Sequence, residues 1–152
     1  MILLQTSDYE YALEDFHLFY PHAIELFKEH HREVDLFGAS LDIDVQMYRR
    51  MQDADALKVF TVREWGRLIG YCAFFLYKHC HHKTSIHAKQ DVLFIKKDKR
   101  GKGLSFLKYC ESQLKNMGVQ VIHQSVPCQN DWSKVLEYLK YEKLEITYMR
   151  RL

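Results

Sequence analysis

The sequence predicts a mixed α/β fold with a central β-sheet, and three features of the chain carry that prediction. Two apolar runs, residues 57–63 and 68–77, flank a tight turn, which is typical of an antiparallel hairpin. A third apolar run ends at Ile95 and is followed by a basic, glycine-bearing turn and then an amphipathic helix. Further helical and strand-like patterns alternate up to the end of the chain.

Length and composition predict one globular domain over residues 1–152, because 47% of the residues are hydrophobic and 28% are charged. The net charge of +2 does not by itself indicate nucleic-acid binding. The first residues turn polar too soon for a secretory signal, and no run approaches the roughly 18 apolar residues of a membrane span. Four cysteines without Cys-x-x-Cys spacing predict reduced thiols in a cytoplasmic protein without a membrane partner.

The order of elements follows from the apolar periodicity. Before the hairpin, the pattern predicts helices over 8–19 and 23–34, which Pro21 separates, and a third helix from Val45 to Gln52 with Asp42 or Asp44 as its cap. After the glycine turn, apolar residues at helical spacing predict a helix that ends at Gly118. A strand over 119–126, a helix over 132–139 and a last strand over 144–150 complete the predicted order.

The strand, glycine turn and helix around residues 91–118 are a common arrangement for binding a phosphate, since glycines let the backbone approach an anion at a helix start. A P-loop is disfavoured because the frame Gly-x-x-x-x-Gly-Lys-Ser/Thr is lacking. A dinucleotide-binding turn is disfavoured because Phe106 stands where its third glycine would be. A solvated basic turn that only caps the helix is the alternative without a ligand.

The hexapeptide Arg100-Gly-Lys-Gly-Leu-Ser105 resembles the pyrophosphate loop of the GNAT superfamily of acyl-CoA-dependent N-acyltransferases, whose pattern is Gln/Arg-x-x-Gly-x-Gly/Ala. Only Ser105 departs from that pattern, and serine is still small. The predicted element order is also similar to that of the GNAT fold, over about residues 57–152 or, at its widest, the whole chain. The segments 90–95 and 147–152 look most like those of small acetyltransferases carried by bacteriophages.

The resemblance implies a mostly antiparallel central sheet flanked by helices, and transfer of an acetyl group from acetyl-CoA to a primary amine of a small molecule or protein. It implies that the loop holds the pyrophosphate through its main chain and that the central strand pairs with the pantetheine arm. The cofactor-binding residues expected on this basis are Leu93, Phe94, Ile95, Arg100, Gly101, Lys102, Gly103, Leu104 and Ser105.

Candidate catalytic residues come from three parts of the chain. Asp91 matches the position where family members with a side-chain base often carry it, and burial would raise its pKa usefully; it would otherwise only end the exposed part of its strand. His87 shares its face, and His123 on the next strand is a second candidate, although a strand histidine is more often structural. The thiolate would be protonated by Tyr148 or by water.

The family's usual general acid is a tyrosine in a late helix, in a pattern like Leu-Tyr-Glu-Lys-x-Gly-Phe. Leu136 stands at the tyrosine position here and Lys140 at the glycine, so the sequence departs from the pattern at both positions. Tyr138 is two positions away and would point elsewhere on the helix. A thiolate with a pKa near 8–9 needs little help to leave, so transfer does not require that tyrosine.

Other readings concern metals and partners. The run His79-Cys-His-His82 invites a metal site, but neighbouring residues of an extended chain point in opposite directions, so we expect no metal. A CoA-binding protein without catalysis is one alternative, and a nucleic-acid-binding module using the basic turn 96–102 is another, although no aromatic stacking pattern accompanies it. A homodimer is left open. Acidic residues of the first helices would attract a cationic amine, or would simply be solvated: Glu10, Glu14, Asp15, Glu25 and Glu29.

Overall fold

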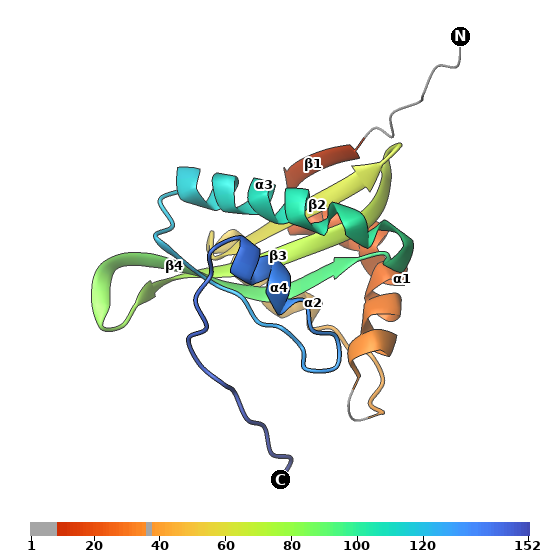
Figure 1. The fold of residues 1–152 in the computed structure, drawn as a ribbon. Helices are drawn as coiled ribbons and strands as arrows, with labels where there is room; N and C mark the ends of the chain where they lie inside the picture. The colour runs from red at the N-terminus through yellow and green to blue at the C-terminus, as the bar shows by residue number, and fades with distance from the viewer. Residues whose placement is uncertain (1–8, 36–37) are drawn as a thin grey trace.

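A computed structural model describes residues 9–35 and 38–152 and contains a five-stranded sheet in the order β1-β2-β3-β4-β5 (Figure 1). The first four strands pair antiparallel, and β5 runs parallel to β4. Their bounds are β1 Tyr9–Glu14, β2 Leu57–Glu64, β3 Arg67–His79, β4 His82–Ile95 and β5 Val121–His123. The predicted mixed, mostly antiparallel sheet is therefore confirmed.

Helices cover both faces of the sheet. On one face α1 (Phe16–Val34) packs with α2 (Val45–Asp53) against a core that includes Tyr71 and Phe94. On the other face α3 (Gly103–Asn116) packs through Phe106 against a second core. A 3-10 turn, Lys97–Lys102, precedes α3, and the short α4 spans Ser133–Tyr138. No helix of the described residues is long and apolar enough to cross a membrane.

Several local predictions in the middle of the chain are confirmed. The predicted third helix is α2, and its cap is Asp44, whose side chain accepts a hydrogen bond from the Met47 N–H at 2.8 Å. The predicted hairpin turns through Trp65 and Gly66 with positive φ at both residues, which matches the right-handed twist of the strands. Gly118 ends α3 with φ +88°, a conformation that glycine adopts without strain.

The predicted helix over residues 8–19 is wrong, because residues 9–14 form strand β1 along β2 (residue 8 lies outside the described part). Tyr9 and Tyr11 follow a period of two, and the Tyr11 ring packs on Phe106. Pro21 does not separate two helices either. The single helix α1 starts after Asp15, whose carboxylate accepts the His17 N–H at 2.8 Å, and continues through Pro21.

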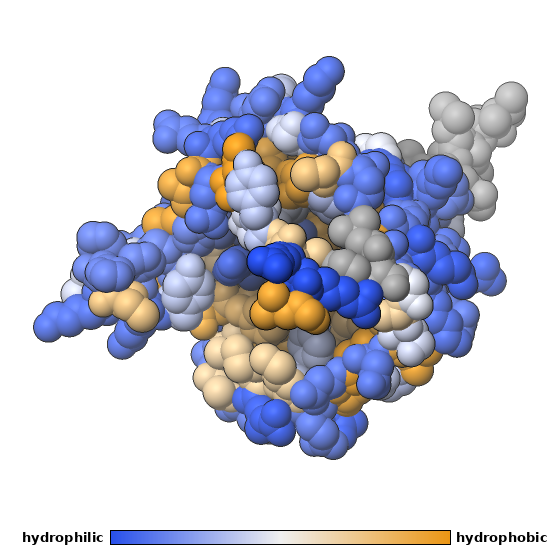
Figure 2. All heavy atoms as spheres, turned by 90° about the horizontal axis from the view of Figure 1, so that it is seen from below, coloured by the Kyte–Doolittle hydropathy of each residue, from blue (hydrophilic) through white to orange (hydrophobic). Residues whose placement is uncertain are grey.

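The C-terminal predictions are partly wrong. The strand expected over 119–126 shortens to the three residues of β5, and residues 144–150 form no strand. The alternating side chains that suggested this last strand lie in solvent, with Leu144 75% and Ile146 64% exposed. A strand needs a neighbouring edge to pair with, and β5 offers only a very short one. On the face seen in Figure 2, hydrophobic residues interrupt the hydrophilic surface near its centre.

Replacing Gly70 by alanine is expected to destabilise the fold by roughly 1–3 kcal/mol, because an added methyl group overpacks the sheet. A Cβ atom at Gly70 would stand 2.8 Å from the Phe94 carbonyl oxygen and 2.9 Å from Val62 Cγ1. Urea denaturation measures the loss. Gly101→Ala is the matched control, since a Cβ there meets nothing within 4 Å. An equal effect of the two substitutions would contradict the prediction.

Candidate functional site

The central strand β4 has an open edge at its C-terminal end. Strand β5 pairs with β4 only from His87 to Lys89, and the two strands then separate. Gln90 bridges the start of the gap, because its side-chain oxygen accepts the Ser125 N–H at 3.0 Å. Beyond this point a cavity of about 500 Å³ opens along β4. Its walls come from α1, β4, the start of α3 and the β5–α4 connection.

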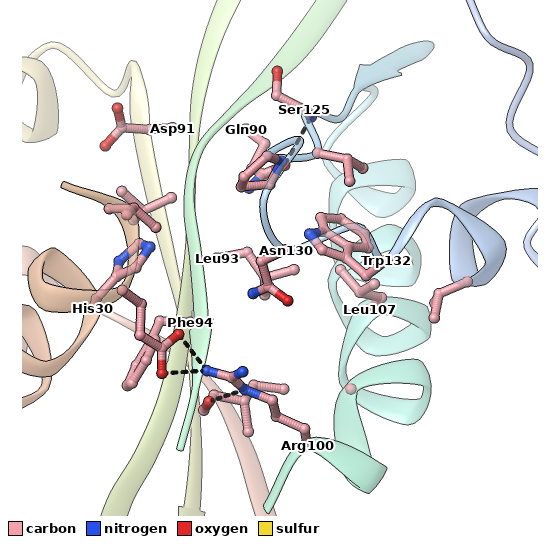
Figure 3. A pocket seen from close by; sticks show the side chains of 18 of the residues that line it. His30, Gln90, Asp91, Leu93, Phe94, Arg100, Leu107, Ser125, Asn130 and Trp132 are labelled. Atoms are coloured by element: carbon pink, nitrogen blue, oxygen red, sulfur yellow. Dashed lines mark hydrogen bonds and ion pairs between the residues drawn. The ribbon is translucent and has the colours of Figure 1, made fainter. Parts of the chain in front are cut away.

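The cavity passes around the strand rather than lying on one face of the sheet. Figure 3 shows Asp91 and His30 on one side of β4, and Leu107 and Trp132 on the other. All four side chains line the same cavity. A ligand in it would therefore reach the α1 side and the α3 side of the sheet at once.

The main chain of Leu93 and Ile95 faces the open edge. The Lys96 N–H donates to the Ile69 carbonyl on β3 at 2.8 Å, so Lys96 faces β3. Hydrogen-bonding groups of successive residues in a strand alternate in direction, so those of Ile95 and Leu93 face away from β3. The Ile95 carbonyl indeed accepts a hydrogen bond from Arg100 Nε at 3.1 Å. Phe94, in contrast, presents its main chain to β3 and contributes its side chain to the cavity wall.

The glycines at the start of α3 leave open space where other residues would carry a side chain, and the packing of the fold does not require that space to be empty. Gly103 lines the cavity with φ −58°, an ordinary helical value, and a Cβ there would only touch Ile95 Cδ1 at 3.5 Å. A Cβ at Gly101 would meet nothing within 4 Å. Neither glycine is required by backbone strain or close packing within the described protein. The turn therefore fits a ligand that approaches its backbone closely, as the pyrophosphate prediction demands.

Basic side chains of the 3-10 turn before α3 contact neighbouring elements of the fold. Lys99 pairs with Glu64 of β2 at 2.7 Å, and the Lys102 ammonium lies 4.7 Å from the centre of the Tyr9 ring. Arg100 reaches back to α1, where it pairs with Glu33 at 2.5 Å. These contacts hold the turn against both faces of the sheet, so Arg100 positions the cavity wall as well as adding charge to it.

Asp91 sits in a β-bulge. The ladder between β3 and β4 pairs Ala73 with Val92 and Phe74 with Gln90, so Asp91 is the extra residue without a partner. The bulge turns its side chain toward α2, where the Tyr48 hydroxyl donates to Asp91 Oδ2 at 2.5 Å. Burial raises the pKa of the Asp91 carboxyl, and the hydrogen bond from Tyr48 opposes that rise. Burial, followed by the contact with Asp91, raises the pKa of Tyr48.

His30 is a cavity residue that was not among the candidates named from the sequence. Its Nδ1 lies 3.2 Å from the Tyr71 hydroxyl, and its ring stacks on Phe94 with centres 5.2 Å apart. Burial lowers the pKa of His30, which favours the uncharged form of the ring. A signal for it was present, because His30 continues the spacing of three and four residues that the buried positions of α1 follow: Phe16, Phe19, Ala23 and Leu26.

The other histidine candidates lie outside the cavity wall. His87 is 7% exposed, and its Nδ1 lies 2.9 Å from His123 Nε2, so one ring donates to the other. The His79 ring stacks against His82 and lies near His87. In the described part of the chain, no group of three or more His, Cys, Asp or Glu residues is arranged to hold a metal ion. The catalytic role of His123 stays a prediction that its position does not favour.

The late helix keeps the departures seen in the sequence. Leu136 is 9% exposed within α4, and Lys140 adopts φ +68° at the position where the family pattern has glycine. Tyr138 is 64% exposed and lies under the Lys108 ammonium. Tyr148 is 88% exposed in the C-terminal segment and does not line the cavity, so its role as an acid also stays a prediction without support from its position.

Residues from the β5–α4 connection complete the cavity and were not foreseen. Ser125, Asn130 and Trp132 all line it. For this segment the sequence predicts only a strand over 119–126 and a helix from Trp132 with Asn130 or Asp131 as its cap, and Asp131 does accept the Ser133 N–H at 2.8 Å. No pattern in a single sequence marks the other three, because their place depends on where β5 leaves β4.

Solved structures with a similar fold include acetyltransferases. An aminoglycoside acetyltransferase from an uncultured soil metagenomic sample matches with a TM-score of 0.71, at 11% identity over 95% of each chain. A predicted acetyltransferase with acetyl-CoA from Clostridium acetobutylicum matches at 0.70 and 12% identity, over 95% of this chain and 96% of the other. The aminoglycoside N-acetyltransferase AAC(6')-Iy in complex with CoA matches at 0.69 and 16% identity over 99% of each chain.

Comparisons of the sequence itself give no match: no protein-family model and no curated protein is similar to it. At these low identities the structural likeness establishes the fold. The chain has the GNAT fold, which the resemblance of its glycine turn implied, although both ends of the chain differ from the predicted element order.

Proposed function

We propose that this protein, whose fold is that of the GNAT acetyltransferases, transfers the acetyl group of acetyl-CoA to a primary amine. One observation carries the proposal. A single cavity joins the open edge of β4, the glycine turn before α3 and the carboxyl of Asp91. An extended thioester needs an edge to pair with, a place for its phosphates and a base near the acceptor amine. The cavity brings these three features together.

The cofactor would be held mainly by the main chain. Leu93 and Ile95 present main-chain groups at the open edge, and Gly103 and Leu104 line the cavity at the start of α3. Gly101, Lys102 and Ser105 are exposed beside this wall, where they would meet the outer part of the pyrophosphate. When bound, acetyl-CoA would supply an acyl group already activated as a thioester.

Asp91 is the proposed general base. Its raised pKa makes the carboxylate a better proton acceptor than an ordinary aspartate. Tyr48 fixes the carboxyl through its hydrogen bond, so Tyr48 is a positioning residue. The ring of His30 forms part of the wall on the same side of β4. Asp91 would take one proton from an alkylammonium and leave a nitrogen lone pair for attack.

A CoA-binding protein that has lost catalysis is the second candidate, and the buried Leu136 in place of the usual tyrosine favours it. In the active enzyme, water entering the open cavity would protonate the thiolate in place of that tyrosine. The nucleic-acid reading loses support, because Lys99, Arg100 and Lys102 of the basic turn already contact Glu64, Glu33 and Tyr9.

Two measurements test the proposal. Acetyl-CoA is expected to raise the Tm of the protein, because a ligand that binds only the folded state stabilises it. Free thiol is then expected to appear when primary amines are added with acetyl-CoA. Stabilisation without thiol release over a broad amine panel would favour the inactive binder. Absence of stabilisation at millimolar acetyl-CoA would refute both CoA readings.

We also propose that the protein works in the cytoplasm. All four cysteines are free thiols, and Cys72 and Cys110 are buried next to each other without forming a disulfide. The bacteriophage-type resemblance rests on segments 90–95 and 147–152 alone and stays a prediction.

A further inference from the structure

A second cavity of about 220 Å³ lies on the α1–α2 side of the sheet. It shares three wall residues with the first cavity, namely His30, Val34 and Val92, so the two spaces meet at β4. Its position places it beside Asp91, because Tyr48 lines the second cavity and donates its hydroxyl hydrogen bond to Asp91 in the first.

The wall of this second cavity is aromatic and aliphatic. Three rings of the wall meet edge to face around the space. The ring centres of Phe19 and Tyr71 are 5.4 Å apart, and those of Phe27 and Tyr71 are 5.0 Å apart. Phe16 and Tyr48 stack at 5.1 Å on the α2 side. Leu41 and Ile43 close the wall from the segment before α2. Such a wall offers van der Waals contact and very few hydrogen bonds to an occupant.

Its size selects a compact occupant. A dry apolar cavity of about 150 Å³ in another protein is large enough for benzene. The present volume therefore suits one aromatic ring with a short chain, and it is too small for several sugar rings. An aromatic body also matches the rings in the wall, because aromatic pairs gain energy beyond the area they bury.

The polar groups near the junction suit one nitrogen only. Asp91, Tyr48 and His30 line the walls near the place where the two cavities join, and Asp91 is the one carboxyl among them. Glu33, the other carboxylate in the wall of the first cavity, is paired with Arg100 at 2.5 Å. Two of the acidic residues that would attract a polycation are paired elsewhere: Glu14 with Arg63 at 3.0 Å, and Glu25 with Lys28 at 2.8 Å. Neither lines either cavity. A polyamine or aminoglycoside would have to leave most of its charges unpaired against apolar walls.

We propose that the acceptor is a primary amine on a short chain that carries a single aromatic ring, with its ring in the second cavity and its nitrogen beside Asp91. The inference rests on the acetyltransferase function proposed above. In the transfer, a nitrogen–carbon bond forms while the carbon–sulfur bond breaks. The alkylammonium loses two protons: Asp91 takes the first and passes it to solvent, and the second, which leaves the nitrogen as the amide forms, balances the proton that the thiolate takes up. No oxidant or reductant is needed.

Calorimetric titration of the protein with 2-phenylethylamine, without an acyl donor, tests the site directly. Ethanolamine, spermidine and kanamycin are titrated in parallel. The aromatic amine is expected to bind, and its kcat/KM with acetyl-CoA is expected to exceed that of each other amine at least about tenfold, the effect of burying a ring that the others lack.

Two variants locate the binding. Ala73→Leu adds volume inside the second cavity, since Ala73 lines it and is 4% exposed. Leu41→Lys changes its outer wall with little risk to folding, since Leu41 is 39% exposed outside any helix or strand. Each is expected to weaken 2-phenylethylamine binding at least about tenfold. Leu144→Ser, in the exposed C-terminal segment, is the control and should bind like the unchanged protein.

The outcomes separate this inference from the proposed function. Acetylation of kanamycin or spermidine with no binding of 2-phenylethylamine would overturn the inference and leave the acetyltransferase intact. Binding of 2-phenylethylamine that both cavity variants weaken, without thiol release from any amine, would overturn the enzyme and keep the aromatic site. Unchanged binding in folded Leu41→Lys and Ala73→Leu proteins would place the amine elsewhere and refute the inference.

Discussion

Replacing Gly103 by glutamate is expected to abolish acetyl-CoA binding, with a loss of affinity of at least about a hundredfold. Gly103 lines the cavity at the first residue of α3, where a phosphate would meet the positive end of the helix. The glutamate would fill that space and set a negative charge against the phosphates. We expect the fold to tolerate the substitution, because a Cβ at this position makes only an ordinary contact with Ile95. Calorimetric titration of each variant with acetyl-CoA measures the change.

Two matched variants separate the local effect from a general one. Ser112→Glu adds the same charge on an exposed part of α3, away from the cavity, and should bind acetyl-CoA normally. Gly103→Ala adds only a methyl group and should fold normally with a smaller loss of affinity. If Gly103→Glu binds acetyl-CoA as tightly as Ser112→Glu does, the glycine turn is not the phosphate site.

The turn was predictable because its signals are local. A strand, two glycines and an amphipathic helix within about 30 residues specify a phosphate-binding geometry whatever packs around them. The same holds for the hairpin turn at Gly66 and the cap at Asp44, since each depends on the conformation of a few adjacent residues. The helices and strands over 45–118 could therefore be predicted closely.

Predictions at the two ends of the chain failed because they depended on distant partners. Tyr9–Glu14 is a strand only because β2 presents an edge and α3 presents Phe106 to Tyr11. Residues 144–150 alternate like a strand, yet no edge of the described sheet takes them up. Local periodicity states what a segment is able to form, while the pairing that decides the matter lies elsewhere in the chain.

For the site, the sequence could supply Asp91 and the β4 segment but not their surroundings. The bulge that turns Asp91 toward Tyr48 is a one-residue register shift, which period-two spacing does not foresee. Tyr48 comes 43 residues earlier in the chain and His30 comes from another helix, so only the packed structure places them around one carboxyl. His87 and His123 were candidates because of their positions on neighbouring strands. In the structure their rings hydrogen-bond to each other outside the cavity.

Replacing Asp91 by asparagine is expected to lower kcat about 10²–10⁴-fold at neutral pH, the usual contribution of a general base. Asparagine keeps an oxygen to accept the Tyr48 hydrogen bond, so acetyl-CoA affinity should be unchanged. The ratio of wild-type to variant rate should fall as the pH drops through the raised pKa of Asp91, because the protonated carboxyl accepts no proton. Glu142→Gln, an exposed acid after α4, is the control and should keep the wild-type rate.

The same substitution is expected to raise stability, which distinguishes a base from a structural carboxyl. The pKa of Asp91 is higher in the folded protein than in the unfolded chain, so the folded state holds its proton more tightly. Stability is therefore lost as the pH rises from the unfolded value of about 3.9 through the raised folded value, and the deficit persists at neutral pH. Asp91→Asn removes that deficit, so its Tm should exceed the wild-type Tm at pH 7, and the difference should shrink toward pH 4. A lower Tm at pH 7 together with unchanged kcat would show that Asp91 supports the fold and is not the base.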